Sequence, residues 1–255
     1  MDWGLRASAE KLIVQEDWSI GAYYTHFRTS GSQSKNSRID DAQMPLKGLN
    51  FDGTQGVGLV KSTGNVQWND LEIDLKKSYF VNKSFLLEPM IGLKSSWVEL
   101  KQWSQYTGGS FLSVNTDHVK DRSKYFGLGP SIGNKAEWFL GNGFSLSGLV
   151  DIGLEYGIFK VSYDEYLSND NTKKIHLTES KHQFSPIFDF AFDMNYGFYF
   201  KQNKAFINFS LGYEAIFFLK QNQMLQLIGN NGYRIQNISE DLSFHGITGG
   251  ISVTF

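Results

Sequence analysis

Residues 143–158 read GFSLSGLVDIGLEYGI, and apolar residues alternate with small or polar ones along most of this stretch. One set of alternate positions holds Phe144, Leu146, Gly148, Val150, Ile152, Leu154, Tyr156 and Ile158, and the other holds Ser145, Ser147, Asp151, Gly153 and Glu155. Successive side chains of a β-strand point to opposite faces, so the pattern predicts one strand with an apolar face and a polar face. Strands of soluble sheets average about 5–6 residues, whereas a tilted strand that crosses a membrane needs about 9–11. The length of the pattern therefore favours a membrane strand.

The same alternation recurs along the chain. It predicts nine strands, over residues 3–12, 18–28, 66–80, 85–101, 124–139, 143–161, 182–199, 205–219 and 242–255. Short connections alternate with long ones along the chain. The short ones are at 13–17, 81–84, 140–143 and 201–204, and the long ones are at about 29–65, 104–122, 163–180 and 221–240. Outer-membrane barrels have this rhythm, because their periplasmic turns are tight and their extracellular loops are extended. We predict one all-β domain over residues 1–255, a transmembrane antiparallel up-and-down β-barrel.

The composition excludes several classes of protein. The chain has 255 residues and a formal net charge of −2, which gives no reason to expect a nucleic-acid partner. It contains no cysteine, so disulfides and thiolate metal sites are ruled out. No stretch approaches the ~18 consecutive apolar residues of a membrane helix. The aromatic content of 15% is high, and it leaves a soluble β-sandwich as the rival of an outer-membrane barrel.

Aromatic residues on the apolar face gather at both ends of the predicted strands. Trp18, Tyr79, Trp138, Phe144, Tyr196 and Phe255 lie towards the short turns, and Tyr24, Trp97, Phe126, Tyr156, Phe184 and Phe217 lie towards the long loops. Two aromatic belts at the two headgroup levels of a membrane account for this placement, whereas a single soluble core does not.

The chain ends in HGITGGISVTF, residues 245–255, a further alternating strand. We expect this strand to close the barrel against the first one and to end at the periplasmic rim. A terminal strand that ends in Phe also resembles the signal read by the outer-membrane insertion machinery, so this machinery is an expected partner. The turn at 13–17 makes strand 3–12 run downward. Because bacterial barrels start with an upward strand and have an even strand number, we expect at least one strand before Trp3 and ten or more in total.

Three segments resemble a known family. They are YFGLGPSIGNKAEWFLGNGFSLSG (125–148), DWGLRASAEKLIVQEDWSIGAYYTHFRTSGS (2–32) and LEIDLKKSYFVNKSFLLEPMIGLKSSWVEL (71–100). They are similar to hairpins of the Legionella-type major outer membrane protein family, which also occurs in Chlamydia-related bacteria. The resemblance implies a pore-forming protein of the outer membrane. It carries over no catalytic residues, and it implies a signal peptide and further residues upstream of the segment at 2–32.

The polar phase of the strands is expected to face the interior of the barrel. Its charged residues are Asp70, Glu72, Asp74, Lys76, Glu88, Lys94, Lys135, Glu137, Asp151, Glu155, Asp189, Asp193 and Glu214, together with Arg6 and Glu10. Two interpretations stay open. Paired charges can fill and close a narrow barrel of about ten strands. Alternatively, the excess of carboxylates can line a water-filled channel that favours cations.

The sequence predicts no catalytic chemistry. Asp117 and His118 are adjacent on an extended chain, so their side chains point to opposite sides and form a poor catalytic pair. No phosphate-binding loop, metal-ligand spacing or nucleophile motif occurs, so no enzyme activity, cofactor or metal is expected.

The predicted function is passive passage of ions or small hydrophilic solutes through the bacterial outer membrane, with a preference for cations. The alternative is a plugged barrel that acts through its long loops as an adhesin or a structural surface protein. The expected surroundings are the lipid bilayer and lipopolysaccharide. A soluble β-sandwich remains the third interpretation.

Overall fold

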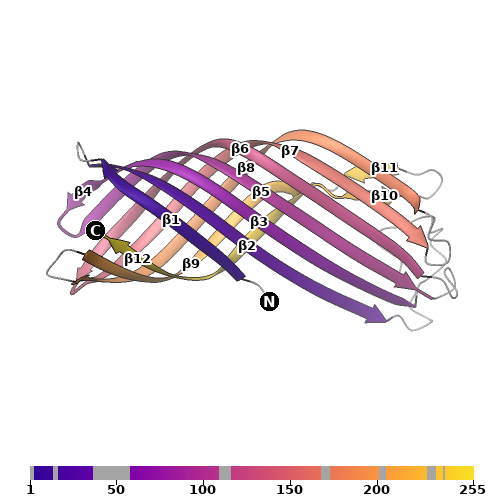
Figure 1. The fold of residues 1–255 in the computed structure, drawn as a ribbon, viewed down its shortest axis with the longest axis horizontal. Coiled ribbons are helices and arrows are strands. Elements are labelled where there is room, and N and C mark those ends of the chain that lie inside the picture. Colours follow the sequence, from indigo (N-terminus) through magenta and orange to yellow (C-terminus); the bar gives the residue numbers. More distant parts are fainter. Residues whose placement is uncertain are drawn as a thin grey trace.

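A computed structural model gives the fold and describes residues 3–13, 17–36, 58–108, 116–167, 173–200, 205–228, 234–237 and 239–255. A ten-stranded antiparallel sheet dominates it (Figure 1). Its order is β1 (Trp3–Ile13), β2 (Trp18–Asn36), β3 (Leu59–Lys77), β5 (Phe85–Thr107), β6 (Thr116–Gly141), β7 (Phe144–Leu167), β8 (Lys173–Phe200), β9 (Ala205–Asn222) and β12 (Glu240–Thr254). The short β4 (Tyr79–Asn82) pairs with β5, and β10 (Leu225–Ile228) pairs with β11 (Arg234–Asn237) in a separate two-stranded sheet.

The predicted fold class is confirmed. Each of the nine strands in this order pairs antiparallel with the one after it, and the sheet curls so that its two ends approach each other (Figure 1). Side chains join the two ends: Arg6 of β1 forms an ion pair with Glu214 of β9 at 2.5 Å, and Phe27 of β2 lies 5.0 Å from Phe244 of β12 between ring centroids. The curled sheet therefore encloses an interior.

The predicted closure of the barrel is wrong within the described residues. β1 and β12 are the two edges of the sheet and form no backbone ladder with each other in the part that the structure describes. The physical reason is direction. Nine strands follow one another with a reversal at each step, so β1 and β12 run the same way and cannot join by the antiparallel ladder that an up-and-down barrel with an even number of strands uses for closure.

All nine predicted strands are present, and most are longer than predicted at the end that carries the long connections. Residues 30–36 of β2 pair in register with residues 59–65 of β3, although both stretches had been assigned to a loop. The predicted loops at 104–122 and 163–180 are shortened in the same way by β5–β6 and β7–β8. The predicted strand 66–80 is broken at Ser78, and the predicted loop 221–240 contains the β10–β11 hairpin.

The turn between β6 and β7 shows why this short connection could be predicted, whereas most of 13–17 and all of 201–204 lie outside the described residues. Gly141, Asn142 and Gly143 have φ angles of 96°, 53° and 84°, a left-handed conformation that glycine and asparagine tolerate best. A Cβ atom at Gly143 would also collide with the carbonyl oxygen of Gly197. Two glycines around an asparagine thus permit a reversal too tight for most sequences.

The outer surface of the sheet is apolar between its two ends. Exposed apolar residues there include Leu5, Ile73, Ile91, Leu93, Leu128, Ile132, Val150, Ile152, Leu154, Phe190, Phe192, Leu211, Ile247 and Ile251. A continuous apolar outer surface of this kind is unsuited to water and matches the hydrocarbon core of a membrane. Within the described residues, no helix is long and apolar enough to cross a membrane.

The aromatic residues predicted for the two belts lie on this outer surface. Tyr24, Tyr79, Trp97, Phe126, Trp138, Phe144, Tyr156, Phe184, Tyr196, Phe217 and Phe255 are exposed, and Trp18 is half-buried. Several make contacts across neighbouring strands. The ring centroids of Trp97 and Phe126 are 5.5 Å apart near the long connections, and those of Phe144 and Tyr196 are 4.8 Å apart near the short ones.

A charge on the apolar outer surface tests its contact with lipid. We expect Ile152→Arg to destabilise the protein folded in phospholipid vesicles by roughly 2–4 kcal/mol, because Ile152 lies on the outer face of β7 between the belt residues Phe144 and Tyr156. Ile158→Arg, on the same face but beyond Tyr156, is the matched control and should cost only about 0–1 kcal/mol. Urea titration in vesicles measures both. Equal costs would show that depth in a bilayer does not govern this surface.

Candidate functional site

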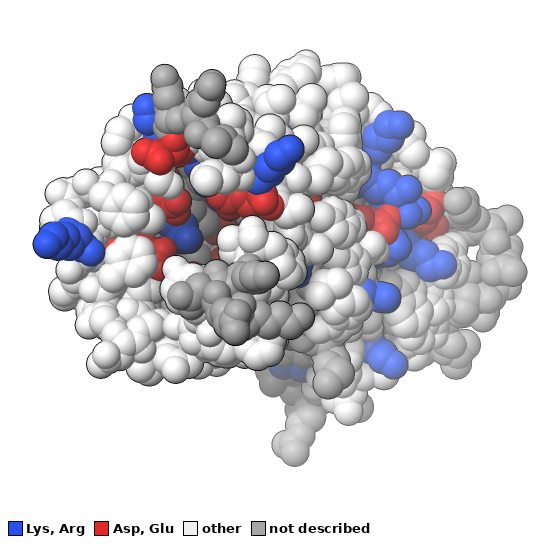
Figure 2. Space-filling model, turned by 60° about the vertical axis from the view of Figure 1, so that its left-hand side comes forward, with Lys and Arg blue, Asp and Glu red and all other residues white. Residues whose placement is uncertain are grey.

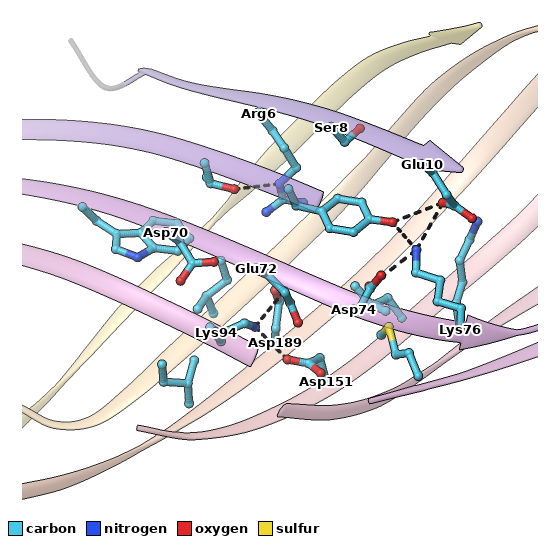
Figure 3. Close-up of a pocket in the computed structure, with 18 of the residues that line it drawn as sticks. Arg6, Ser8, Glu10, Asp70, Glu72, Asp74, Lys76, Lys94, Asp151 and Asp189 are labelled. Carbon is cyan, nitrogen blue, oxygen red and sulfur yellow. Dashed lines mark hydrogen bonds and ion pairs between the residues drawn. The ribbon is translucent and has the colours of Figure 1, made fainter. Parts of the chain in front are cut away.

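The interior of the curled sheet contains a cavity of about 290 Å³ (Figure 3). Ten charged residues line it: Arg6, Glu10, Asp70, Glu72, Asp74, Lys76, Lys94, Lys135, Asp151 and Asp189. They come from β1, β3, β5, β6, β7 and β8, so the curvature of the sheet is what brings them together. We call this cavity the charged chamber. In Figure 2, acidic and basic side chains are visible inside a hollow of the surface.

Lys94 of β5 is the most buried cation of the charged chamber. Its side chain is 4% exposed, and its Nζ lies 2.7 Å from Asp151 Oδ2 and 3.3 Å from Glu72 Oε2 (Figure 3). A buried ammonium group is stable only when carboxylates and hydrogen bonds replace its water. Lys94 therefore links its own strand β5 to β3 and β7 through ion pairs in the interior of the barrel.

A second charged group surrounds Lys76 of β3. Its Nζ lies 3.4 Å from Glu10 Oε2 and 3.6 Å from Asp74 Oδ2, and it also contacts the Tyr23 hydroxyl. The Tyr23 hydroxyl donates to Glu10 at 3.2 Å, and Ser19 donates to the same carboxylate at 2.6 Å. These contacts link the first three strands at the level of the charged chamber.

Arg6 closes the charged chamber on the side where the sheet has its edges. Besides the ion pair with Glu214, its Nε donates a hydrogen bond to Thr25 Oγ1 at 3.0 Å. Arg6 and Glu214 are far apart in the chain, so their contact depends on the curling of the whole sheet.

Two buried carboxylates share one hydroxyl deeper in the barrel. Ser96 Oγ lies 2.7 Å from Asp70 Oδ1 and 2.8 Å from Glu155 Oε1, and the Tyr125 hydroxyl donates to Glu155 Oε2 at 3.0 Å. One hydroxyl has a single proton, so it can donate to only one of the two carboxylates at a time. This shared contact joins β3, β5, β6 and β7 below the outer aromatic belt.

The remaining predicted interior residues lie on the same inner face. Lys135 Nζ is 3.7 Å from Glu88 and 4.0 Å from Glu137, whose carboxylate accepts a hydrogen bond from Ser145. Asp193 is half-buried on β8. The interior set predicted from the sequence is thus brought to one face, while its pairing could not be read from the pattern.

Three carboxylates of the charged chamber are only partly satisfied. Within the described residues, one buried oxygen each of Asp74, Asp151 and Asp189 has no hydrogen-bond partner. A buried carboxylate oxygen without a partner is costly, and the cavity is large enough to hold water. The charged chamber is therefore suited to hold water or small cations.

An apolar cluster forms the wall of the charged chamber on the side of the long connections. Trp68, Ile187, Ile216 and Phe218 line the cavity and belong to a larger buried cluster with Val98, Leu100, Tyr106, Val119, Tyr125, Phe159, Val161, Tyr163, Met224 and Leu225. Phe244 stacks on Trp68 at 5.5 Å between ring centroids. We call this cluster the apolar roof. Sequence reasoning missed it.

The sequence does contain a pattern that could have identified the apolar roof: towards the long connections, the inner positions of a strand become apolar and the outer positions become polar. In β7 the inner positions change from Glu155 to Phe159 and Tyr163, while the outer positions change from Tyr156 to Lys160. The same change occurs in β5, where Val98 and Leu100 follow Ser96 on the inner face. An inverted phase marks where the outer surface leaves lipid and enters water.

Asp117 and His118, which are adjacent in the sequence, have their side chains in different surroundings, as their places on one strand predict. Asp117 is buried, whereas His118 stacks between Trp103 and Tyr166 at 5.8 and 5.0 Å. Across the described ranges, no group of three or more His, Asp or Glu is arranged to hold a metal ion.

Comparison with known families decides the affiliation of this barrel. The family described as Legionella pneumophila major outer membrane protein precursor matches residues 1–255. The chain belongs to this family. Membership confirms the resemblance noted in the sequence and places the protein in the bacterial outer membrane, as predicted. The family is one of outer membrane proteins of the bacterial surface, and the all-β fold agrees with that location. No curated protein sequence matches the chain.

The buried lysine of this major outer membrane protein provides a test of the ion pairs. We expect Lys94→Met to destabilise the protein by about 3–5 kcal/mol, because it leaves Asp151 and Glu72 buried without their cation. Lys135→Met is the matched control. Lys135 is 38% exposed with longer contacts, so its loss should cost about 0–1 kcal/mol. Urea unfolding in detergent micelles compares the two, and similar costs would contradict the role given to Lys94.

Proposed function

We propose that this major outer membrane protein is porin-like and allows passive passage of ions or small hydrophilic solutes. The observation that carries the proposal is the charged chamber, which lies between the two aromatic belts. Its partly satisfied carboxylates favour water inside the barrel at a depth where the outer surface is apolar. Water in the interior is the first requirement for passage of a hydrophilic solute.

The charge of the chamber favours cations. Six carboxylates line it, from Glu10, Asp70, Glu72, Asp74, Asp151 and Asp189, against four basic groups, from Arg6, Lys76, Lys94 and Lys135. The difference, 6 − 4, leaves two negative charges in excess. Apolar walls concentrate the potential of such charges and raise the local concentration of cations, and rings of acidic residues are a common source of cation preference.

A second candidate function follows from the apolar roof. Phe159 and Tyr163 are fully buried in it, so the interior above the charged chamber is packed rather than open. Apolar constrictions block ions by excluding water. If the roof stays packed, the protein is a closed barrel that acts through its long loops at the cell surface. Conductance separates the two functions, because a closed barrel carries no current.

Ion selectivity tests the charged chamber. In planar bilayers across a salt gradient, we expect a reversal potential on the cation side. Asp74→Asn combined with Asp189→Asn should move it towards zero, because it removes the excess negative charge of the chamber. Glu99→Gln with Asp164→Asn changes the net charge equally but outside the chamber, and should leave the potential unchanged. A conducting pore with an anion-side potential would contradict the preference.

Opening the apolar roof tests the path. Phe218 and Phe244 lie 6.0 Å apart between ring centroids, and both contact Trp68 above the charged chamber. We expect Phe218→Ala with Phe244→Ala to raise single-channel conductance several-fold, because a wider and less apolar passage admits water. Phe190→Ala with Phe192→Ala, on the lipid face, is the control and should have no effect. A wild type without current and a roof variant with current would favour the closed barrel.

A further inference from the structure

Four basic residues gather on the outer surface just beyond the outer aromatic belt. They are Lys101 of β5, Arg122 and Lys124 of β6, and Lys160 of β7. The side chains of Lys101, Arg122 and Lys124 are 48%, 43% and 52% exposed, and Lys160 is also exposed. We call them the outer basic patch. In Figure 2, Lys and Arg side chains gather on the right-hand side of the view, with Asp or Glu side chains among them.

The strand register places like charges directly opposite each other in the outer basic patch. Lys101 pairs with Arg122 across β5 and β6, and Lys124 pairs with Lys160 across β6 and β7. Like charges directly opposite on neighbouring strands repel and destabilise a sheet. Two such pairs lie on three adjacent strands, so an anion bound between them would offset their repulsion.

Among the residues that the structure describes, one carboxylate forms ion pairs with the outer basic patch. Glu99 pairs with Arg122, with Lys101 at 2.7 Å and more distantly with Lys124 at 4.0 Å. Partial burial acts to raise the pKa of Glu99, but hydrogen bonds from Lys101 and Arg122 hold that pKa below its ordinary value. Lys160 makes no ion pair within the described residues. The patch thus keeps an excess of positive charge, four basic groups against one acidic.

The height of the outer basic patch matches lipid headgroups. Lys124 lies two residues beyond Phe126 on the same face, and Lys160 lies four residues beyond Tyr156. With a rise of about 3.3 Å per residue and a strand tilt of about 40°, these steps correspond to roughly 5 and 10 Å above the belt. Apolar residues such as Leu128 and Leu154 continue below the belt on the same strands. Acyl chains and headgroup phosphates of one lipid can therefore contact a single continuous surface.

We propose that the outer basic patch is a binding site for the phosphate groups of an outer-leaflet lipid, the lipid A part of lipopolysaccharide. Lysine and arginine bind phosphate oxygens through charge-assisted hydrogen bonds, and phosphate between the opposed pairs removes their repulsion. The acyl chains then lie on the apolar surface of β5, β6 and β7. The proposal rests on the outer-membrane location and is independent of whether the barrel conducts.

The test measures lipid binding to the purified protein in detergent with EDTA present. The probes are bisphosphorylated lipid A and the same lipid after removal of its phosphates, with affinity read by native mass spectrometry. We expect the phosphorylated form to bind at least about tenfold more tightly, because a charge-assisted contact is worth more than the 1.4 kcal/mol that corresponds to a factor of ten. We expect Lys124→Gln with Lys160→Gln to remove most of this difference, and excess inorganic phosphate not to displace the lipid.

Matched variants make the result specific. Lys11→Gln with Lys83→Gln removes two lysines near the other end of the barrel and should leave the affinity unchanged. Lys160→Gln alone breaks no ion pair of the described residues, so it should fold normally and still weaken binding several-fold. Glu99→Gln should strengthen binding, since it removes the competing carboxylate. Equal binding of both lipid forms, full affinity in the double variant, or displacement by inorganic phosphate would overturn the proposal.

Discussion

A bilayer offers no hydrogen bonds, so every backbone N–H and C=O group at its depth must find a partner within the protein. The continuous antiparallel ladders from β2 to β9 meet this requirement, whereas the edge strands β1 and β12 meet it on one side within the described residues. Once the backbone is committed to strands, alternate side chains must face lipid, and these are apolar. Charged residues such as Lys94 and Asp151 are thereby confined to the interior, where mutual pairing replaces part of their hydration. The charged chamber therefore follows from the apolar outer surface, because that surface leaves only inner positions for charged residues between the belts.

The strands could be predicted because a membrane requires the alternation of apolar and polar residues to continue over a length set by its thickness. Along 143–158 the apolar phase is long enough that few other structures fit, and Gly141, Asn142 and Gly143 permit the tight turn before it. The outer extensions could not be predicted. Residues 30–36 are polar on both faces, because water surrounds that part of the sheet, and only their register with 59–65 makes them strands. Hydrophobic periodicity identifies a strand only where one face is apolar and the other polar, and it gives no signal where both faces are polar.

The candidate site was predicted in composition but not in contacts. Alternation assigns Lys94, Asp151 and Glu214 to one face, and the structure places them there. Their partners depend on curvature: the Lys94–Asp151 contact spans β5 and β7, and the Arg6–Glu214 contact spans the two ends of the sheet. No local pattern encodes such contacts. The apolar roof was missed for a related reason. A single apolar residue such as Phe159 at an inner position looks like an exception to the alternation, and only the charged Lys160 at the next, outer position shows that the two faces have exchanged character.

That inversion divides the barrel into two parts stabilised by different forces. Between the belts the outside is already apolar, so inner apolar packing gains little from the hydrophobic effect, and polar pairs such as Lys94–Asp151 hold the interior. Beyond the outer belt the surroundings are polar, first headgroups and then water, so burial of Phe159 and Tyr163 stabilises the sheet as in a soluble protein, and the outer surface can carry Lys124 and Lys160. Under the proposed porin-like function, a solute that crosses the barrel meets both parts in turn. A conducting state must therefore rearrange the apolar roof, and the buried carboxylates of Glu155 and Glu165, which accept hydrogen bonds from the roof residues Tyr125 and Tyr163, must then find other partners.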